Sequence, residues 1–381
     1  MRKLTKAVSV AAAVAMTATC FSTTAFADDT FKIGGIGPIT GGAAVYGQAV
    51  MNASQMAADD INAEGGINGY QIEFNFQDDE HDAEKSVNAY NTLKDWGMQM
   101  LLGTVTSTPC TAVEGEASND NMFLLTPSGS AVESISGDNA FRVCFSDPNQ
   151  GTASAQYIGE NGLAEKVAVI YNSSDVYSSG IYNTFATEAA NQPFEIVSAE
   201  AFTEDSKTDF SVQLQKAKDA GADMVFLPIY YTEASLILTQ AAGMDYAPTF
   251  FGCDGLDGLL AVEGFDTSLA EGVMLLTPFA ADADDEQTKA FVSAYEEKYG
   301  ETPIQFAADA YDGMYIIKAA AEKADITPDM DASAICDALK AAMTEITYDG
   351  LTGSGMTWSA DGEPNKEPKA VVIKDGAYTA M

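Results

Sequence analysis

Short apolar runs alternate with helix-length amphipathic segments along most of this chain. The first strand-like runs are Phe31–Ile36 and Tyr70–Phe76, and helical periodicity follows them over Gln48–Ala63 and Ala83–Trp96. Strands that alternate with helices at this spacing favour a parallel sheet covered by helices, so the predicted fold class is α/β. The pattern restarts near residue 150, which predicts two such lobes with a ligand cleft between them.

The last part of the chain departs from this alternation. Three helices are predicted in near succession, over Gln287–Tyr299, Ala307–Ala324 and Ala332–Met343. Because helices in succession add no strand to a sheet, we expect them to cover the first lobe, while the strand-like segments Gly355–Trp358 and Ala370–Lys374 complete the second. The predicted division is residues 28–147 plus 278–355 for the first lobe and 148–277 plus 356–381 for the second.

The N-terminus has the pattern of a secretory signal peptide. Three basic residues, at positions 2, 3 and 6, precede the apolar run Ala7–Met16, which is too short to span a membrane. Ala25-Phe26-Ala27 fits a small-x-small cleavage site, so residues 1–27 are predicted to be removed from an extracytoplasmic protein. Cys20 keeps a lipid anchor open as the alternative, although Thr19 before it fits that reading poorly.

The charge and the reactive residues exclude several classes of protein. Acidic residues outnumber basic ones by 56 to 19, a net charge of −37, which disfavours binding to nucleic acid or to anionic membranes. The single histidine, His81, and the absence of a G-x-S-x-G elbow argue against a hydrolase triad. The remaining cysteines form no CxxC and are predicted to be buried free thiols; they are Cys110, Cys144, Cys253 and Cys336. We therefore predict no catalytic residues, no metal site and no cofactor.

Small hydroxylic residues follow two successive strand-like runs. Met98–Leu102 leads into a cluster that ends in Thr106, Ser107 and Thr108, and Met122–Leu125 leads into Ser128-Gly129-Ser130. In an open parallel sheet, ligands bind outside the carboxyl ends of the strands, where helix N-termini offer unpaired N–H groups. No Lys or Arg lies between residues 103 and 130, so a carboxylate bound here would be held by dipoles and hydroxyls. The alternative is a pair of ordinary N-capped turns.

A set of motifs from residue 31 to residue 320 resembles the type I periplasmic solute-binding proteins, in the leucine/isoleucine/valine-binding branch of ABC importers. Among them are FKIGGIGPITGGAAVYG, DINAEGGINGYQIEF, LLGTVTSTPCTAV, MFLLTPSGS, AVIYNSSDVYSSG, FFGCDG and FAADAYDGMYIIKAA. Each motif alone is weak, but their order and spacing together are specific. The resemblance implies two Rossmann-like lobes with parallel-dominated sheets, joined by three crossovers, that close on a ligand.

The resemblance also implies a site for an α-amino acid. The residue matching Ser107 holds the ligand carboxylate through its hydroxyl and N–H, and the match to Ser130 donates its N–H to the carboxylate and offers its hydroxyl to the ammonium. The match to Ser128 offers its carbonyl to the ammonium, whose charge is balanced by Asp254 from the second lobe. Aromatic residues that match the walls of the family's pocket are Tyr46, Tyr177, Tyr230 and Phe306.

Four positions depart from the family pattern. Asp254 stands where relatives usually have the longer Glu. His81 and Thr106 occupy positions that a disulfide joins in some relatives, so a polar Thr106 is expected near the pocket. Asp309 lies one helical turn from Phe306, where an apolar residue is common; we expect it to face solvent, with the alternative that it favours a polar or basic ligand side chain.

The predicted function is that of the extracytoplasmic substrate-binding component of an ABC importer for an α-amino acid, with a branched-chain or aliphatic one as the expected ligand. A zwitterion fits because neutral donors on one lobe and a carboxylate on the other leave neither of its charges unpaired when the lobes close. The alternative is a receptor for another small solute, such as a polar or aromatic amino acid, an amide, a urea-like compound or an aromatic acid. The expected partner is a membrane permease, and the expected state is a monomer.

Overall fold

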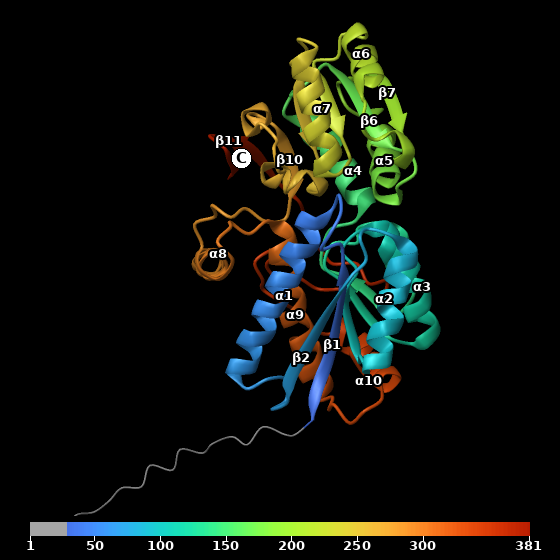
Figure 1. Ribbon diagram of the computed structural model, residues 1–381, viewed down its shortest axis with the longest axis vertical. Coiled ribbons are helices and arrows are strands. Elements are labelled where there is room, and N and C mark those ends of the chain that lie inside the picture. The colour runs from blue at the N-terminus through green and yellow to red at the C-terminus, as the bar shows by residue number, and fades with distance from the viewer. Residues whose placement is uncertain (1–28) are drawn as a thin grey trace, which may run out of the picture.

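The computed structural model describes residues 29–381, so the predicted signal peptide and Cys20 lie outside the described residues. The described chain forms two α/β lobes stacked along the long axis of the molecule (Figure 1). Each lobe has its own twisted sheet with helices on both faces, which confirms the predicted fold class.

The first lobe, the lower one in Figure 1, contains a sheet of parallel strands in the order β2-β1-β3-β4-β5. These strands are β1 (Thr30–Gly37), β2 (Gln71–Asp78), β3 (Met100–Gly103), β4 (Phe123–Thr126) and β5 (Ala140–Arg142). One face is covered by α1 (Ala44–Glu64), α9 (Gln305–Ala324) and α10 (Ala332–Met343). The other face is covered by α2 (Ala83–Trp96) and α3 (Ser107–Asp120). Every residue of β3 and β4 is buried, as expected for central strands covered on both faces.

The second lobe contains a mixed sheet in the order β12-β11-β10-β9-β8-β6-β7. Its parallel strands are β6 (Lys166–Asn172), β7 (Glu195–Phe202), β8 (Met224–Leu227), β9 (Thr249–Gly252) and β10 (Met274–Thr277). The C-terminal hairpin of β11 (Lys369–Lys374) and β12 (Ala377–Ala380) extends this sheet in the antiparallel sense. One face is covered by α4 (Asp147–Glu160) and α5 (Val176–Ala189), the other by α6 (Ser211–Asp219) and α7 (Tyr231–Gly243).

The segment after α10 corrects one sequence prediction. Gly355–Trp358 forms no strand of the second sheet; Met356 and Trp358 make isolated bridges and lie in the hydrophobic core of the first lobe. The Trp358 indole also donates a hydrogen bond to the carbonyl of Arg142 at 2.8 Å. The bulk of this ring, buried against the first lobe, keeps the segment there, so the chain enters the second sheet only at Lys369.

A second correction concerns the helices predicted to cover the first lobe. α9 and α10 do so, but α8 (Glu286–Tyr299) stands beside the junction of the lobes (Figure 1). Its Phe291 and Tyr295 belong to a hydrophobic cluster with members from both lobes. Tyr299 donates to the Asn52 carbonyl on α1 at 2.7 Å, which attaches the helix to the first lobe from outside.

Side chains from the two lobes meet directly, so the lobes are closed on one another. The Tyr231 hydroxyl accepts a hydrogen bond from the Val45 N–H at 3.1 Å. The Thr232 hydroxyl donates to the carbonyl of Gly42 at 2.7 Å. These contacts join the start of α1 and the loop before it to the start of α7 across the cleft. Among the described residues, no helix is long and apolar enough to cross a membrane.

Candidate ligand-binding site

The two Ser/Thr clusters meet at the carboxyl edge of the first sheet, as the sequence predicts. Thr106 is the N-cap of α3 and Ser107 is its first residue. The Ser107 hydroxyl accepts hydrogen bonds from the N–H groups of Ser130, at 3.1 Å, and Ala131, at 3.2 Å. The N–H of Ser130, expected to face a ligand carboxylate, therefore donates to Ser107 in this structure. The Ser128 hydroxyl donates to the carbonyl of Val105 at 2.6 Å and holds the two clusters together.

A buried arginine that the sequence analysis missed orients this loop. Arg142, at the end of β5, is fully buried and donates to the carbonyls of Gly129, at 3.3 Å, Ser130, and Ala131, at 2.9 Å. Because these carbonyls face the guanidinium, the loop N–H groups face the opposite way, toward Ser107. An Arg within an apolar strand is the signal that could have revealed this role.

The second lobe supplies a buried carboxyl group opposite the clusters. Asp254 follows β9, and its Oδ1 accepts a hydrogen bond from the Tyr177 hydroxyl at 2.7 Å. The same hydroxyl accepts from the Gly255 N–H at 2.9 Å, and the Asp254 N–H donates to Gln150 at 3.2 Å. Burial raises the pKa of Asp254 to about 7, and a ligand cation beside it would favour the ionised form.

Aromatic rings from both lobes enclose the space beside Asp254. Tyr46 at the start of α1 stacks on Phe306 of α9, with ring centroids 4.1 Å apart. Tyr177 stacks on Tyr230 at 4.8 Å, and Tyr230 meets Tyr46 edge to face at 5.6 Å. The Tyr46 hydroxyl donates to the Gly255 carbonyl and accepts from the Tyr231 N–H at 3.2 Å, so this ring bridges the lobes.

Asp147 is a second carboxyl group at the site, and the sequence analysis did not select it. Asp147 is the first residue of α4, at the predicted boundary between the two lobes. Asp147 is 1% exposed, neither carboxyl oxygen has a hydrogen-bond partner, and its N–H donates to the carbonyl of Ser130 at 2.9 Å. Burial raises the pKa of Asp147 well above its ordinary value; the nearby Ser130 hydroxyl opposes this rise, and the Asp254 carboxyl adds to it. Such a group calls for a cationic partner.

Other buried polar atoms without partners gather around the same two carboxyl groups. They are the Nε2 of Gln150 and the hydroxyl oxygen of Tyr230. Gln150 already holds the N–H of Asp254, and Tyr230 stacks on the ring that holds the carboxyl of Asp254. This concentration of unsatisfied polar groups between the lobes is what a small polar ligand would satisfy.

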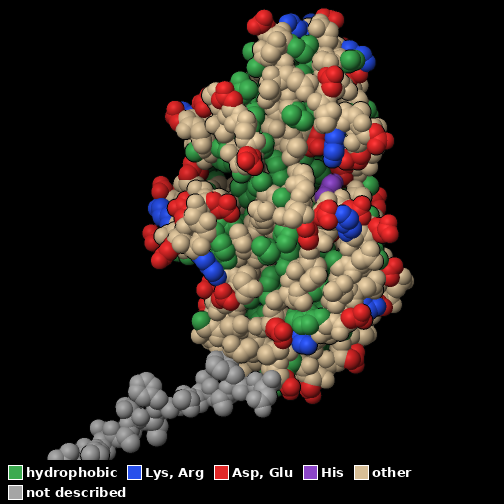
Figure 2. Space-filling view, in the orientation of Figure 1, with side chains coloured by type: hydrophobic (Ala, Val, Ile, Leu, Met, Phe, Trp, Pro, Cys, Tyr) green, Lys and Arg blue, Asp and Glu red, His purple; other side chains and the backbone are tan. Residues whose placement is uncertain are grey.

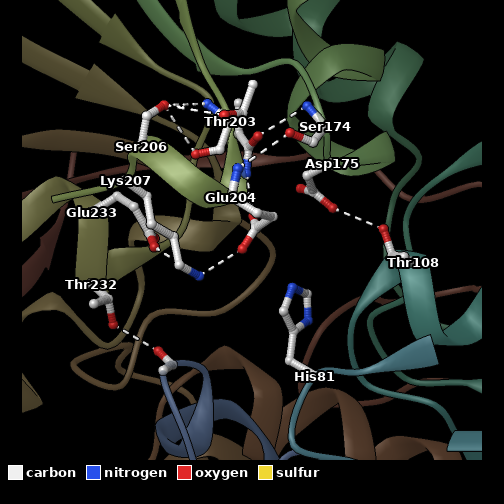
Figure 3. A network of polar contacts seen from close by, with 12 residues as sticks. His81, Thr108, Ser174, Asp175, Thr203, Glu204, Ser206, Lys207, Thr232 and Glu233 are labelled. Atoms are coloured by element: carbon white, nitrogen blue, oxygen red, sulfur yellow. Dashed lines mark hydrogen bonds and ion pairs between the residues drawn. The ribbon is translucent and has the colours of Figure 1, made fainter. Parts of the chain in front are cut away.

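A polar network lies at one side of the cleft (Figure 3). The His81 Nδ1 lies 2.8 Å from the Thr106 hydroxyl, and burial lowers the pKa of this histidine. The Thr108 hydroxyl donates to Asp175 across the cleft at 3.1 Å. Lys207 pairs with Glu204 at 2.7 Å and approaches Glu233 at 3.7 Å. The ring of His81 also meets Tyr230 edge to face, so His81 lies between Thr106 and the aromatic rings.

The expectation that Asp309 faces solvent is wrong. Asp309 is 1% exposed, and its Oδ1 accepts from the Lys366 ammonium at 2.8 Å. Lys366 also donates to the Thr352 hydroxyl at 2.6 Å, so the ion pair joins α9 to the segment that returns to the second lobe. Lys366 therefore compensates the charge of Asp309 directly, although Asp309 is still close enough to Asp254 to raise its pKa.

The described residues contain no cluster of three or more His, Cys, Asp or Glu side chains suited to a metal ion. The four described cysteines are buried and unpaired, as the sequence predicts. The site offers hydroxyls and a helix N-terminus from one lobe, carboxyl groups at and across the junction, and aromatic rings between them.

Comparison with known proteins places this geometry in a family. The family model described as periplasmic binding protein matches residues 30–377. The Leu/Ile/Val-binding protein BraC3 of Rhizobium johnstonii is 31% identical over 352 residues, which cover 89% of this chain and 93% of the relative. The leucine-, isoleucine-, valine-, threonine-, and alanine-binding protein of Pseudomonas aeruginosa is 29% identical over 344 residues, 89% of each chain.

Solved structures agree with the sequence comparisons. The branched-chain amino acid transporter substrate-binding protein LivJ of Streptococcus pneumoniae, solved in complex with isoleucine, matches with a TM-score of 0.83 and 29% identity over 92% of this chain and 98% of that one. The leucine-binding protein LivK of Thermotoga maritima matches with a TM-score of 0.81 and 25% identity, over the same shares of the two chains. The fold, the matched length and these relatives together show that the chain belongs to the periplasmic binding protein family.

Proposed function

We propose that this protein is the extracytoplasmic substrate-binding component of an ABC importer and that it holds an aliphatic α-amino acid between its lobes. The observation that carries the proposal is that two kinds of buried group come together at the lobe junction. The hydroxyls of Ser107 and Ser130 lie on the first lobe, and the carboxyl groups of Asp147 and Asp254 lie at and across the junction. The names of the relatives, which include leucine, isoleucine and valine, support the same class of ligand.

In this proposal the ligand carboxylate lies at the N-terminus of α3. The hydroxyl and N–H of Ser107 and the N–H of Ser130 bind it, and Ser130 is released from its contact with Ser107 to do so. The ligand ammonium lies between Asp254, Asp147, the Ser130 hydroxyl and the Ser128 carbonyl. A ligand with both charges then leaves no carboxyl group buried without a partner.

The ligand side chain would contact aromatic rings. Tyr46, Tyr230 and Phe306 present ring faces and edges, with Tyr177 stacked behind Tyr230. Apolar burial against such rings contributes about 0.8 kcal/mol per methylene group, which favours aliphatic side chains over small ones. Thr106 is the polar exception on this wall, and it is held by His81.

A ligand with a polar side chain is the second candidate. The polar network beside Tyr230 carries Asp175, Glu204 and Glu233 against the single cation Lys207. A side chain with a positive or hydrogen-bond-donating end would be attracted to this excess of negative charge. The same screen that tests aliphatic amino acids distinguishes the two candidates.

Several further features belong to the proposal. We keep the predicted lobes, 28–147 with 278–355 and 148–277 with 356–381, joined by three crossovers, and move only residues 356–366 to the first lobe, because Met356, Trp358 and Lys366 pack there. The protein acts as a monomer, delivers its ligand to a membrane permease and catalyses no reaction. Residues 1–27 direct it out of the cytoplasm, with a lipid anchor at Cys20 as the alternative to simple cleavage after Ala27.

The test is a ligand screen on protein that has been unfolded and refolded to remove bound solute. We expect leucine, isoleucine or valine at 100 times Kd to raise the stability by about 2.7 kcal/mol in thermal unfolding. Asp254→Ala should weaken binding by about 3–5 kcal/mol in calorimetry, because the ligand ammonium loses its buried counter-charge. The exposed Asp361→Ala is the matched control and should bind as the wild type does.

Two results would contradict the proposal. A response only to polar, basic or aromatic amino acids would support the proposed contacts to the ligand carboxylate and ammonium. It would contradict the proposal that the ligand side chain is aliphatic. No response to any α-amino acid, with a response to an amide, urea or benzoate, would overturn the assignment of Ser107, Ser130 and Asp254.

A further inference from the structure

A cavity of about 550 Å³ lies at the lobe junction, apart from the site described above. It is bounded by α1, α8, the loop after β9 and the C-terminal hairpin β11–β12, so both lobes contribute to its wall. Figure 2 shows hydrophobic side chains recessed between the upper lobe and α8 on this side of the molecule. None of Ser107, Ser130, Asp147 or Asp254 lines it.

The wall of this cavity is apolar and aromatic. Val45 of α1, Val292 of α8 and Ile304 before α9 supply aliphatic surface. Phe279, Tyr295 and Tyr378 supply aromatic rings from three separate segments. The volume and the lining are those of a site for a small organic molecule, since such sites measure about 300–1,000 Å³ and are mostly apolar.

The charged groups of the cavity are all acidic. Asp257, Asp282, Glu296 and Glu301 line it, and no Lys or Arg does. The nearby Lys298 pairs instead with Asp59 on the far side of α8, at 2.9 Å. Acidic residues are in excess over the whole chain, so exposed acidic residues at the rim of the cavity are not by themselves evidence of a cation site. Asp257 is more significant, because it is 5% exposed and accepts a hydrogen bond only from the uncharged N–H of Gln305, so no residue lining the cavity balances its charge when it is ionised.

We propose that this cavity binds an amphipathic organic cation, with its apolar body on the aliphatic and aromatic wall and its ammonium group directed toward Asp257. Aromatic rings beside the acidic group favour this class of ligand further, because the faces of Tyr and Phe rings attract cations. An anion of the same size would meet only like charges in the cavity, so the site discriminates by charge as well as by shape.

The cavity is connected to the proposed amino-acid site through one residue. The N–H of Gln305 donates to Asp257 at 2.7 Å, and its side-chain amide donates to the carbonyl of Asp254 at 3.1 Å. The cavity wall also comes from both lobes in their closed arrangement, so a ligand there stabilises closure. It follows that the cation and the amino acid tighten one another's binding. This coupling rests on the proposed function, whereas binding of the cation does not.

The test is titration calorimetry with hexyltrimethylammonium and, at the same chain length, hexyl sulfate. We expect saturable binding of one hexyltrimethylammonium per chain and at least tenfold weaker binding of hexyl sulfate. Val292→Trp should abolish binding by filling the cavity, and Asp257→Asn should weaken it at least tenfold. Val212→Trp, at an exposed site on α6, is the matched control and should bind normally. Ala261→Trp, on the opposite rim, replaces Val292→Trp if that variant does not fold.

The outcomes separate this proposal from the proposed function. Asp254→Ala is expected to disable the amino-acid site. If this variant still binds hexyltrimethylammonium, the cation site in the cavity is independent of the amino-acid site. Tighter binding of hexyltrimethylammonium in the presence of saturating leucine supports the coupling between the two sites. An affinity for hexyltrimethylammonium that leucine does not change contradicts the coupling. The cavity proposal is wrong if the wild type shows no saturable binding, if cation and anion bind equally, or if both filling variants bind as the wild type does.

Discussion

At the scale of single residues, Asp147 and Asp254 place two carboxyl groups beside one proposed ammonium site. Each is buried, and burial raises the pKa of both. Tyr177 and Gln150 hold Asp254 in place, whereas the carboxyl oxygens of Asp147 have no partner. Asp147 is therefore the more costly group in the folded protein and the one that gains more from a ligand cation.

Asp147→Asn should change binding and stability in opposite directions. We expect ligand affinity to fall by about 1.5–3 kcal/mol, because the ammonium loses a charged hydrogen-bond partner. The ligand-free protein should unfold at the same or a higher temperature, because Asn removes an unpartnered buried carboxyl group. Calorimetry and thermal unfolding measure the two effects, with the exposed Asp361→Asn as control.

If Asp147→Asn bound the ligand normally and lost stability, Asp147 would be a structural residue of α4 and would not contact the ligand. Ser107→Ala offers a second comparison at this scale. It should lose less affinity than Asp254→Ala, because its backbone N–H at the helix N-terminus remains.

At the scale of elements, a buried ion pair connects α9 to the returning segment of the chain. Lys366 pairs with Asp309 on α9 and with Thr352, and Thr352 in turn donates to Asp312 one turn further along α9, at 2.7 Å. Asp312 also accepts from the N–H groups of Leu351 and Thr352 at 2.9 Å. Two carboxyl groups on one helix face therefore position the segment that leads into β11.

Lys366→Met should destabilise the protein by about 3–5 kcal/mol, because it leaves the Asp309 carboxylate buried without its counter-charge. The double variant Lys366→Met with Asp309→Leu should recover most of that loss, because neither charge is then buried alone. Urea unfolding measures both variants. The exposed pair of Lys323 with Glu345 provides the control, since Lys323→Met should cost no more than about 1 kcal/mol.

An unchanged urea midpoint in Lys366→Met would contradict this account of the segment. Equal losses in the single and the double variant would mean that Lys366 acts through its side-chain volume, and that its charge is unimportant for stability.

At the scale of the whole molecule, closure of the lobes brings the carboxyl groups of the site out of water. The junction is held by direct contacts such as Thr108 with Asp175 and Thr232 with Gly42 (Figure 3). Burial raises the pKa of Asp254 and Asp257 to about 7 and that of Asp175 to about 6. Protonation and ligand binding are therefore linked across the closed cleft.

Ligand affinity should rise as the pH is raised from 5 to 7 and should level off above about 7. The free protein holds a proton on Asp254 below its pKa of about 7, and a bound ammonium favours the ionised form, so binding releases a proton. In the free protein the same raised pKa means that the contribution of Asp254 to stability is present below pH 4 and is lost as the pH rises through 7.

Calorimetry at pH 6 in buffers with different ionisation enthalpies measures this proton release directly. Asp254→Asn should remove most of it. Proton uptake, or an affinity that falls between pH 5 and 7, would show that another group controls the linkage.

The sequence by itself determined the local elements and the class of fold. Alternating strand and helix periodicity predicted α/β lobes, and the predicted helices Ala83–Trp96 and Ala332–Met343 have the observed bounds of α2 and α10. The Ser/Thr clusters after β3 and β4 were also evident, because parallel strands bring their carboxyl ends to one edge of the sheet. These features depend on neighbours in sequence, where steric preference and hydrophobic period act.

Only the tertiary structure decided which distant groups meet. It buried Trp358 in the first lobe, paired Asp309 with Lys366 across 57 positions and left the carboxyl oxygens of Asp147 without a partner. It also formed the acidic cavity of Asp257, which draws its wall from both lobes. The hydrophobic periodicity of the sequence does not predict such contacts, because the cost of burying a charge depends on which groups the folded chain places beside it.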